Sequence, residues 1–243
     1  MSRRTKEGMT CDDAVKSFNA AMSVIRGAAD QVLNLPSPDT VEDGIVNRCG
    51  SCRRGKNSRA CSGWSISLRR GSEISFEAPV GNRRVIVLVE GSQVWDFSKA
   101  IPGFPAIPVE GSYSVSILDE NSSLITRQHS DVANFAQAGS VGHLQLGGLP
   151  SMGSRPDYEW LDVPRWPMMP VDLVLLVELL IYSFFPLYWL QNSETVAWRR
   201  AVQGSETQMY SPWRARMELY WNQRESRDSW LKEQCNINSS WRS

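Results

Sequence analysis

The sequence predicts an α+β fold, and two observations support this prediction. An N-terminal segment with apolar residues at helical spacing precedes short segments in which apolar and polar residues alternate, and helical spacing returns in the C-terminal third. Strands grouped in one block, with helices before and after, argue against a doubly wound parallel sheet. We expect an N-terminal helix, an antiparallel β-meander of about four or five strands, a long irregular crossing and C-terminal helices.

The N-terminal helix is predicted over residues 11–35. Apolar residues follow the 3.6-residue period from Val15 to Leu33, so one side of this helix is expected to be buried. The prolines at Pro36 and Pro38 mark its end. Residues 37–63 that follow are polar, basic and rich in Gly and Ser, which predicts a long loop.

The strands are predicted from residue 64 onward, where the apolar period changes from 3.6 to two. Turn signals, among them Gly91-Ser92, separate these segments. The predicted strands are 64–68, 74–76, 84–90 and 112–118, with 123–127 as a further partner. Residues 130–170 show no sustained period and are expected to cross the surface irregularly.

Three C-terminal helices are predicted. The first runs from Val171 to Phe185, and the second covers about residues 193–203, with Gly204 as its stop. The third is predicted from Pro212 to about residue 234, with Ser211 as its N-cap. Eight of the ten tryptophans lie after residue 159, and at helical spacing we expect such side chains to be core. The chain is thus divided into 1–36, 37–63, 64–170 and 171–243, the last two expected to form one domain.

Composition excludes several classes of protein. The 243 residues include 26 basic and 26 acidic side chains, 42% are hydrophobic and 21% are charged. These values argue against a disordered chain, a fibrous repeat and a broadly basic nucleic-acid coat. The polar N-terminus carries no apolar secretory segment, and five cysteines at uneven spacing do not indicate a disulfide framework. We therefore expect a reduced, cytoplasmic protein.

The segment from Leu173 to Leu190 has two interpretations. It is almost entirely apolar and close to the shortest length that spans a bilayer, which allows a membrane-attached protein. However, it contains Glu178, Pro186 would end or kink a helix within it, and Asp172 before it suits a helix N-terminus. We favour a buried core helix, with membrane attachment as the alternative.

A possible zinc site lies in the predicted loop. Cys49 and Cys52 have the spacing of a zinc half-site, and Cys61 follows them. A fourth ligand would have to come from far away in the sequence, so free thiols are the other interpretation. Zinc is the one cofactor that the sequence suggests.

The same loop could bind anions. Residues 48–70 carry seven basic side chains and no acidic one. Such a cluster can contact phosphates, so an alternative function is a zinc-stapled, basic nucleic-acid-binding protein. The candidate anion-binding residues are Arg53, Arg54, Lys56 and Arg59.

The glycines and the histidines match no common catalytic motif. The sequence has no phosphate-binding G-x-x-x-x-G-K-[ST] loop and no G-x-S-x-G nucleophile turn. His129-Ser130-Asp131 places three catalytic residue types side by side, but adjacency in sequence is not triad geometry. Whether the protein is an enzyme stays open, and these observations favour a non-enzyme.

One resemblance to a known family rests on short motifs. His129-Ser130-Asp131-Val132 is followed by the segment 142–148, which reads GHLQLGG, then by Trp160-Leu161-Asp162-Val163-Pro164 and a Leu-rich helix from Val171. In this order of elements and motifs, residues 64–190 resemble the bacterial branch of the ubiquitin-conjugating enzymes. That family has a helix, a meander, a His-Pro-Asn or His-Pro-His loop, a catalytic cysteine, a Trp/Pro-rich crossing and further helices.

The departures from the family pattern bear on activity. Gln145 stands where the family has its nucleophilic cysteine, and an amide cannot form the thioester that a thiolate forms. Ser130 and Asp131 replace Pro and Asn of the histidine motif. The resemblance thus implies a catalytically inactive variant that serves as a non-catalytic protein-interaction module, in a bacterial defence or protein-modification pathway. Its pseudo-active site would contain His129, Asp131, His143 and Gln145, in a groove beside the helix that begins near Val171. The alternative is an unrelated α+β domain.

Overall fold

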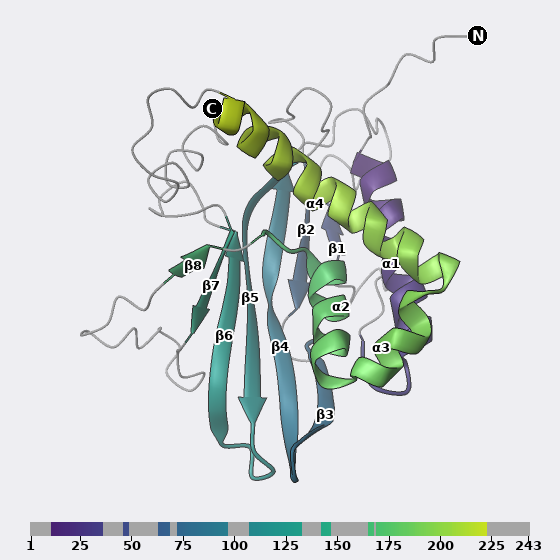
Figure 1. Cartoon of the computed structure of the whole chain (residues 1–243), viewed down its shortest axis with the longest axis vertical. Helices are drawn as coiled ribbons and strands as arrows, with labels where there is room; N and C mark the ends of the chain where they lie inside the picture. Colours follow the sequence, from purple (N-terminus) through teal and green to yellow (C-terminus); the bar gives the residue numbers. More distant parts are fainter. Residues whose placement is uncertain are drawn as a thin grey trace.

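The computed structural model describes residues 11–35, 46–48, 63–68, 72–96, 107–132, 142–146, 165–167 and 169–222. It has the predicted α+β class, with a helix before and helices after an antiparallel sheet (Figure 1). The elements are α1 (Cys11–Ala29), β1 (Val46–Arg48), β2 (Gly63–Leu68), β3 (Ile74–Val80), β4 (Arg83–Asp96), β5 (Ile107–Leu118), β6 (Leu124–Val132), β7 (Gly142–Leu146), β8 (Arg165–Pro167), α2 (Leu173–Phe184), α3 (Pro186–Ser193) and α4 (Val196–Asn222).

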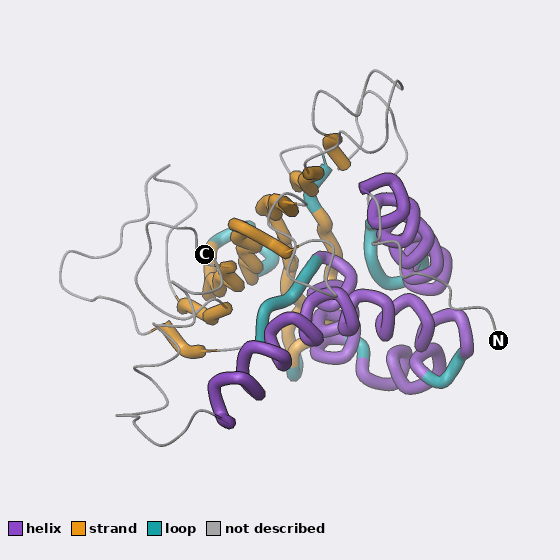
Figure 2. Tube along the Cα trace, turned by 90° about the horizontal axis from the view of Figure 1, so that it is seen from above, coloured by secondary structure: helices purple, strands orange, loops and turns teal. Residues whose placement is uncertain are grey.

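The strands form one sheet in the order β1-β2-β4-β5-β6-β7-β8, with β3 paired to β4. Every paired strand is antiparallel to its neighbour. The helices lie together on one side of the strands, so the described part of the molecule has two layers (Figure 2). The predicted meander is confirmed, and β7 and β8 extend it into residues that we expected to be irregular. β1 likewise forms within the predicted loop 37–63, by pairing with β2.

Helix α1 buries the side that its sequence predicts. Ala14, Val15, Phe18, Met22 and Ile25 are all buried against the sheet and the other helices. The helix ends at Ala29, earlier than predicted, and the backbone N–H groups of residues 32 and 33 both donate to the carbonyl of residue 29. Residue 33 is still buried, because the chain after the helix continues to pack on the core.

Strand β4 continues through the turn that we predicted at Gly91-Ser92, so that prediction is wrong. Gly91 has φ of +144°, a backbone conformation that side chains disfavour. A Cβ atom there would collide with the backbone carbonyl of Ser112 and lie 2.8 Å from the Cα of Tyr113. Glycine at residue 91 therefore allows β4 to stay paired with β5, although Gly91-Ser92 in the sequence is typical of a turn.

Helix α2 is the predicted core helix. Asp172 caps its N-terminus, because the carboxylate accepts a hydrogen bond of 2.9 Å from the backbone N–H of Leu175. The helix ends at Phe184, and Pro186 begins the separate helix α3. No helix in the described residues is long and apolar enough to cross a membrane. The buried side chains of α2 are Leu173, Val174, Leu175, Leu176, Val177, Leu180 and Ile181.

Helix α4 is continuous through residues 204 and 212, where we predicted a stop and a new start. Those two boundary predictions are wrong. At residue 204 the helix continues because one of its faces is held by packing over several turns. Trp198, Ala201, Val202, Ser205 and Met209 are buried at the i, i+3, i+4, i+7 and i+11 positions of this face. The prediction that Trp198 is a core residue is confirmed.

The continuity of α4 gives a stability prediction at Gly204. A Cβ atom at this position meets no atom within 4 Å. Because alanine is favoured over glycine inside a helix by about 1 kcal/mol, Gly204→Ala should raise the free energy of unfolding by roughly that amount. Urea denaturation followed by circular dichroism measures the change. Gly27→Ala in α1, which also meets no atom within 4 Å, is the matched control. A loss of stability in Gly204→Ala alone would contradict a continuous α4.

Candidate functional site

The four predicted pseudo-active-site residues occupy neighbouring positions of the sheet. In the register of β6 and β7, His129 is opposite Gln145 and Asp131 is opposite His143. His129 is also opposite Ser114 of β5. The fold therefore brings these backbone positions together, but it places them in paired strands, whereas the resemblance implied a loop.

His129 is buried and bound to its neighbours across the sheet. Its ring Nδ1 lies 2.8 Å from the hydroxyl Oγ of Ser114. The same Oγ accepts a hydrogen bond of 3.0 Å from the guanidinium of Arg127. Ser114 and His129 are both less than a tenth exposed, so this pair joins β5 to β6 inside the structure. This arrangement holds strands together and does not present a nucleophile at the surface.

The predicted metal and anion sites fall outside the described residues. These are Cys49, Cys52 and Cys61 for zinc, and Arg53, Arg54, Lys56 and Arg59 for anions. Among the residues that the structure does describe, no group of three or more His, Cys, Asp or Glu side chains could hold a metal ion. The zinc and nucleic-acid hypotheses stay predictions.

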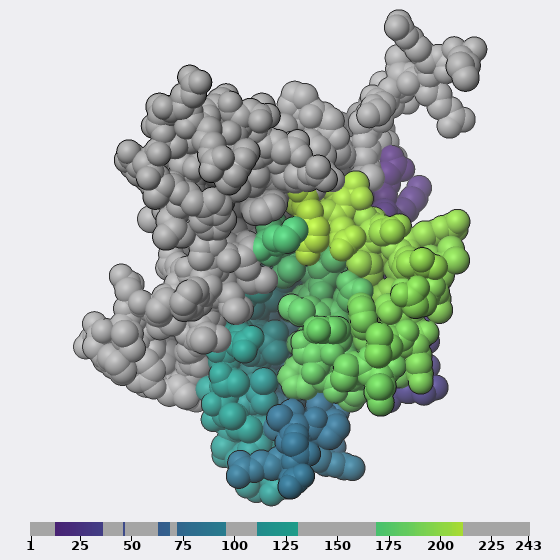
Figure 3. Space-filling model, in the orientation of Figure 1, coloured from purple at the N-terminus to yellow at the C-terminus, as the bar shows by residue number. Residues whose placement is uncertain are grey.

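A groove lies between α2, α3 and α4, and we name it the α2–α4 groove. Its cavity volume is about 430 Å³. The lining is apolar except for two carboxylates, Glu178 and Glu206, and for tyrosine hydroxyls. The lining residues are Met169, Val171, Leu175, Glu178, Leu179, Tyr182, Trp189, Val202, Glu206 and Tyr210. These helices form the green-to-yellow face in Figure 3.

Glu178 connects the three helices that form this groove. Its Oε1 accepts hydrogen bonds from the indole N–H of Trp189 at 3.2 Å and of Trp198 at 3.1 Å. Trp189 comes from α3 and Trp198 from α4, so this carboxylate ties three helices together. Tyr182 packs edge-on against Trp189, with ring centroids 5.2 Å apart. Glu178, the single charged residue between Leu173 and Leu190, therefore forms hydrogen bonds within the protein.

The second carboxylate makes the groove electrostatically negative. Desolvation raises the pKa of Glu206, and the nearby charge of Glu178 raises it further. Burial, together with the charges of Asp172, Glu206 and Glu178, raises the pKa of Tyr210 to about 12. The ion pairs between described residues are Arg84–Glu77 and Arg199–Glu194, and neither involves a groove carboxylate.

Large apolar side chains are exposed on α2 within the groove lining, and on α3 outside that lining. Leu187 of α3 is 75% exposed and Leu190 is 57% exposed, and the i, i+3 spacing puts them on one side of that helix. Leu179 and Tyr182 of α2 are 46% and 54% exposed. Helix α3 has no buried side chain at all. A set of this kind is typical of an interaction surface.

Sequence reasoning did not predict that these apolar residues of α2 and α3 are exposed. The segment from Leu173 to Leu190 was interpreted as a single apolar helix, so its second half was expected to be buried with its first. Pro186 was the available signal: it divides the segment, and Leu187 and Leu190 then fall on a short separate helix. Glu206 carried no signal, because an isolated carboxylate in a helix is ordinary in sequence.

Comparison with known proteins adds no constraint on the function. Scans of protein-family models, of curated proteins and of solved structures each found no match for this chain. The function is therefore argued from the geometry of the described residues.

Proposed function

We propose that the protein is a non-catalytic protein-interaction module that binds a basic, apolar segment of a partner protein in the α2–α4 groove. The observation that carries this proposal is the exposure of Leu179 and Tyr182, which line the groove together with two carboxylates. The order of elements, which resembles that of the ubiquitin-conjugating enzymes, is compatible with a scaffold of this kind.

The non-catalytic part of the proposal rests on the surroundings of His129. Gln145 is the residue opposite His129 in the sheet, and its amide cannot act as the thiolate nucleophile of a conjugating enzyme. His129 itself is engaged by Ser114 through Nδ1 and is buried. Exposed large apolar side chains, by contrast, lie elsewhere, on the helices.

The chemistry of the partner follows from the groove. An apolar side chain of the partner would cover Leu179 and Tyr182, which line the groove, and remove their exposed surface from water. A Lys or Arg of the partner would lie against Glu206 and Glu178, which have no ion-pair partner among the described residues. This pairing would offset the charge of Glu178, which adds to desolvation in raising the pKa of Glu206.

Selection from a phage-displayed library of random peptides on the full chain tests the proposal. We expect enriched peptides to combine two or more large apolar residues with a Lys or Arg. Their binding should fall about tenfold or more with Leu179→Ser, because an exposed apolar contact of the groove lining is lost. Glu206→Gln should reduce it less, and the reduction should diminish at high salt.

The matched controls use exposed residues away from the groove. Ile125 of β6 is 54% exposed, so Ile125→Ser changes apolar surface without touching the groove. Arg84 and Glu77 pair on exposed strands, so Glu77→Gln removes a distant carboxylate. Peptides that bind these controls and Leu179→Ser equally, or that carry no basic residue, would refute the proposal.

A further inference from the structure

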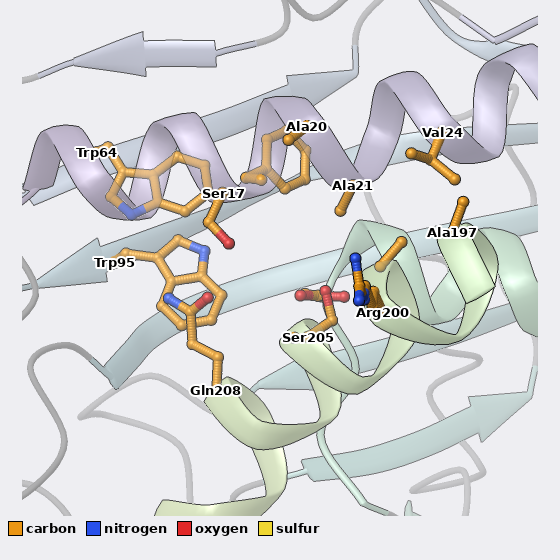
Figure 4. Close-up of a pocket in the computed structure, with 14 residues that line it drawn as sticks. Ser17, Ala20, Ala21, Val24, Trp64, Trp95, Ala197, Arg200, Ser205 and Gln208 are labelled. Carbon is orange, nitrogen blue, oxygen red and sulfur yellow. The ribbon is translucent and has the colours of Figure 1, made fainter.

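A second cavity lies on the other side of α4, between that helix, α1 and the sheet, and we name it the α1–α4 cavity (Figure 4). Its volume is about 350 Å³, within the usual range for small-molecule sites of roughly 300–1,000 Å³. The lining residues are Ser17, Phe18, Ala20, Ala21, Val24, Trp64, Trp95, Asp172, Ala197, Arg200, Ala201, Gly204, Ser205 and Gln208.

The cavity exists because its helical walls carry small residues. Ala20 and Ala21 of α1 and Ala197, Ala201 and Gly204 of α4 all line it. A Cβ atom added at residue 204 would meet no atom within 4 Å, so this part of the wall is open. Two helices with larger side chains at these positions would close the space between them.

Aromatic rings form one end of the cavity. Trp64 of β2 and Trp95 of β4 are stacked, with ring centroids 5.6 Å apart and an interplanar angle of 10°. Phe18 of α1 packs against Trp64, with centroids 5.2 Å apart. This wall offers a flat, apolar surface to a ligand that can pack against aromatic rings.

Three hydrogen-bond donors of the same wall have no acceptor. They are the indole Nε1 atoms of Trp64 and Trp95 and the amide Nε2 of Gln208, all buried. Figure 4 shows Gln208 beside Trp95 at this end of the cavity. A buried donor without an acceptor costs about 1–3 kcal/mol, so three of them at one wall favour a ligand that brings acceptors.

Two charged side chains, Asp172 and Arg200, also line the cavity. The carboxylate of Asp172 already accepts hydrogen bonds from the Ser205 hydroxyl and from the backbone N–H groups of Leu175 and Val174. Arg200 is exposed on α4 and takes no part in the ion pairs between described residues. The guanidinium is thus the charged group of the lining that is left to bind a ligand.

We propose that the α1–α4 cavity binds a small carboxylic acid whose flat body carries a hydrogen-bond acceptor. The body would lie among the alanines and against the Trp64–Trp95 stack, with its acceptor toward the indole N–H groups, and the carboxylate would pair with Arg200 at the side open to solvent. The buried polar atoms of the lining without a partner are all N–H donors, and Arg200 is its exposed cation, which favours an anionic, acceptor-bearing ligand over an amine. The site is separate from the α2–α4 groove and does not depend on its function.

Binding of quinoline-6-carboxylate, whose ring nitrogen is the acceptor, with quinoline-6-carboxamide as the neutral analogue, tests this proposal on the full chain labelled with ¹⁵N. We expect quinoline-6-carboxylate to shift the indole N–H resonances of Trp64 and Trp95, assigned with single Trp→Phe variants. Calorimetry should show about tenfold weaker binding of this compound to Arg200→Gln, and unchanged binding of the carboxamide, because only the charged ligand loses a charge-assisted pair.

Filling the cavity provides the second test. Gly204→Leu should abolish binding of both compounds, whereas Gly204→Ala should leave most of the cavity and most of the affinity. Ala197→Leu, on an exposed part of the wall, gives an independent blocked variant if Gly204→Leu does not fold. The proposal is overturned if quinoline-6-carboxylate at millimolar concentration shifts neither indole resonance. It is equally overturned if Arg200→Gln weakens both compounds alike, or if both blocked variants bind as the wild type does.

Discussion

Gly91→Ala should lower the free energy of unfolding by about 3 kcal/mol, the largest effect that we expect from a single added carbon atom. The backbone at residue 91 has φ of +144°, and holding a side chain in such a region costs roughly 1–3 kcal/mol. The added Cβ would also collide with the carbonyl of Ser112 and approach the Cα of Tyr113. Since both neighbours are backbone atoms, β4 and β5 must separate locally to make room.

Urea denaturation followed by circular dichroism measures this cost, with Gly81→Ala as its matched control. Residue 81 lies in the turn between β3 and β4, with φ of +61°, and a Cβ atom there meets nothing within 4 Å. The control carries the backbone penalty without the collision, so it should cost about 1 kcal/mol. Equal, small losses for the two variants would show that β4 and β5 do not approach each other as described.

The stability of the protein should fall by about 3 kcal/mol as the pH rises from about 4 to above 6, because of Asp172. Burial raises the pKa of this carboxyl to about 6, against about 3.9 in an unfolded chain. Between these values the folded protein keeps a proton that the unfolded chain has released. The stabilisation is therefore complete below the unfolded pKa and is lost as the pH passes the folded one.

Asp172→Asn isolates this effect. Asparagine keeps an oxygen that can cap α2 by accepting from the N–H of Leu175, but it cannot ionise. The difference in unfolding free energy between wild type and Asp172→Asn should therefore shrink or reverse between pH 4 and 7. Glu206, whose pKa is also raised, is present in both proteins and cancels in the difference. A difference that stays constant across this pH range would contradict a buried carboxyl at the start of α2.

Hydrophobic periodicity was enough to predict most elements of the fold. The change from period 3.6 to period two located α1, the central strands and α2, because each of these buries one side or nearly all of its surface. Local stop signals were less informative. Gly91 reads as a turn but lies inside β4, and Gly204 reads as a helix end but lies inside α4. In both places contacts between distant segments outweigh the local preference of glycine.

The candidate sites were harder to predict, because they depend on register and exposure. The sequence indicated that His129 and Gln145 belong to one region, but only the pairing of β6 with β7 sets them opposite each other. Ser114, which contacts His129, lies on a preceding strand and had no motif to mark it. The relationship to ubiquitin-conjugating enzymes stays a prediction.

The exposed apolar side chains of α2 and α3 could not be predicted, because an apolar run in a sequence does not say which of its residues face solvent. Leu176 and Leu187 have the same chemistry, yet the first is 3% exposed and the second 75%. The difference arises at Phe185, where the chain leaves α2 and turns into α3.

Hydrogen–deuterium exchange of the full chain, with and without a selected basic, apolar peptide, tests the central claim most directly. If the α2–α4 groove is the binding site, the peptide should slow exchange in α2 and α3 and leave β5 and β6 around His129 unchanged, and Leu179→Ser should remove the protection. Protection of β6 and β7 without any change in α2 and α3 would contradict the account and place binding at the region of His129 and Gln145.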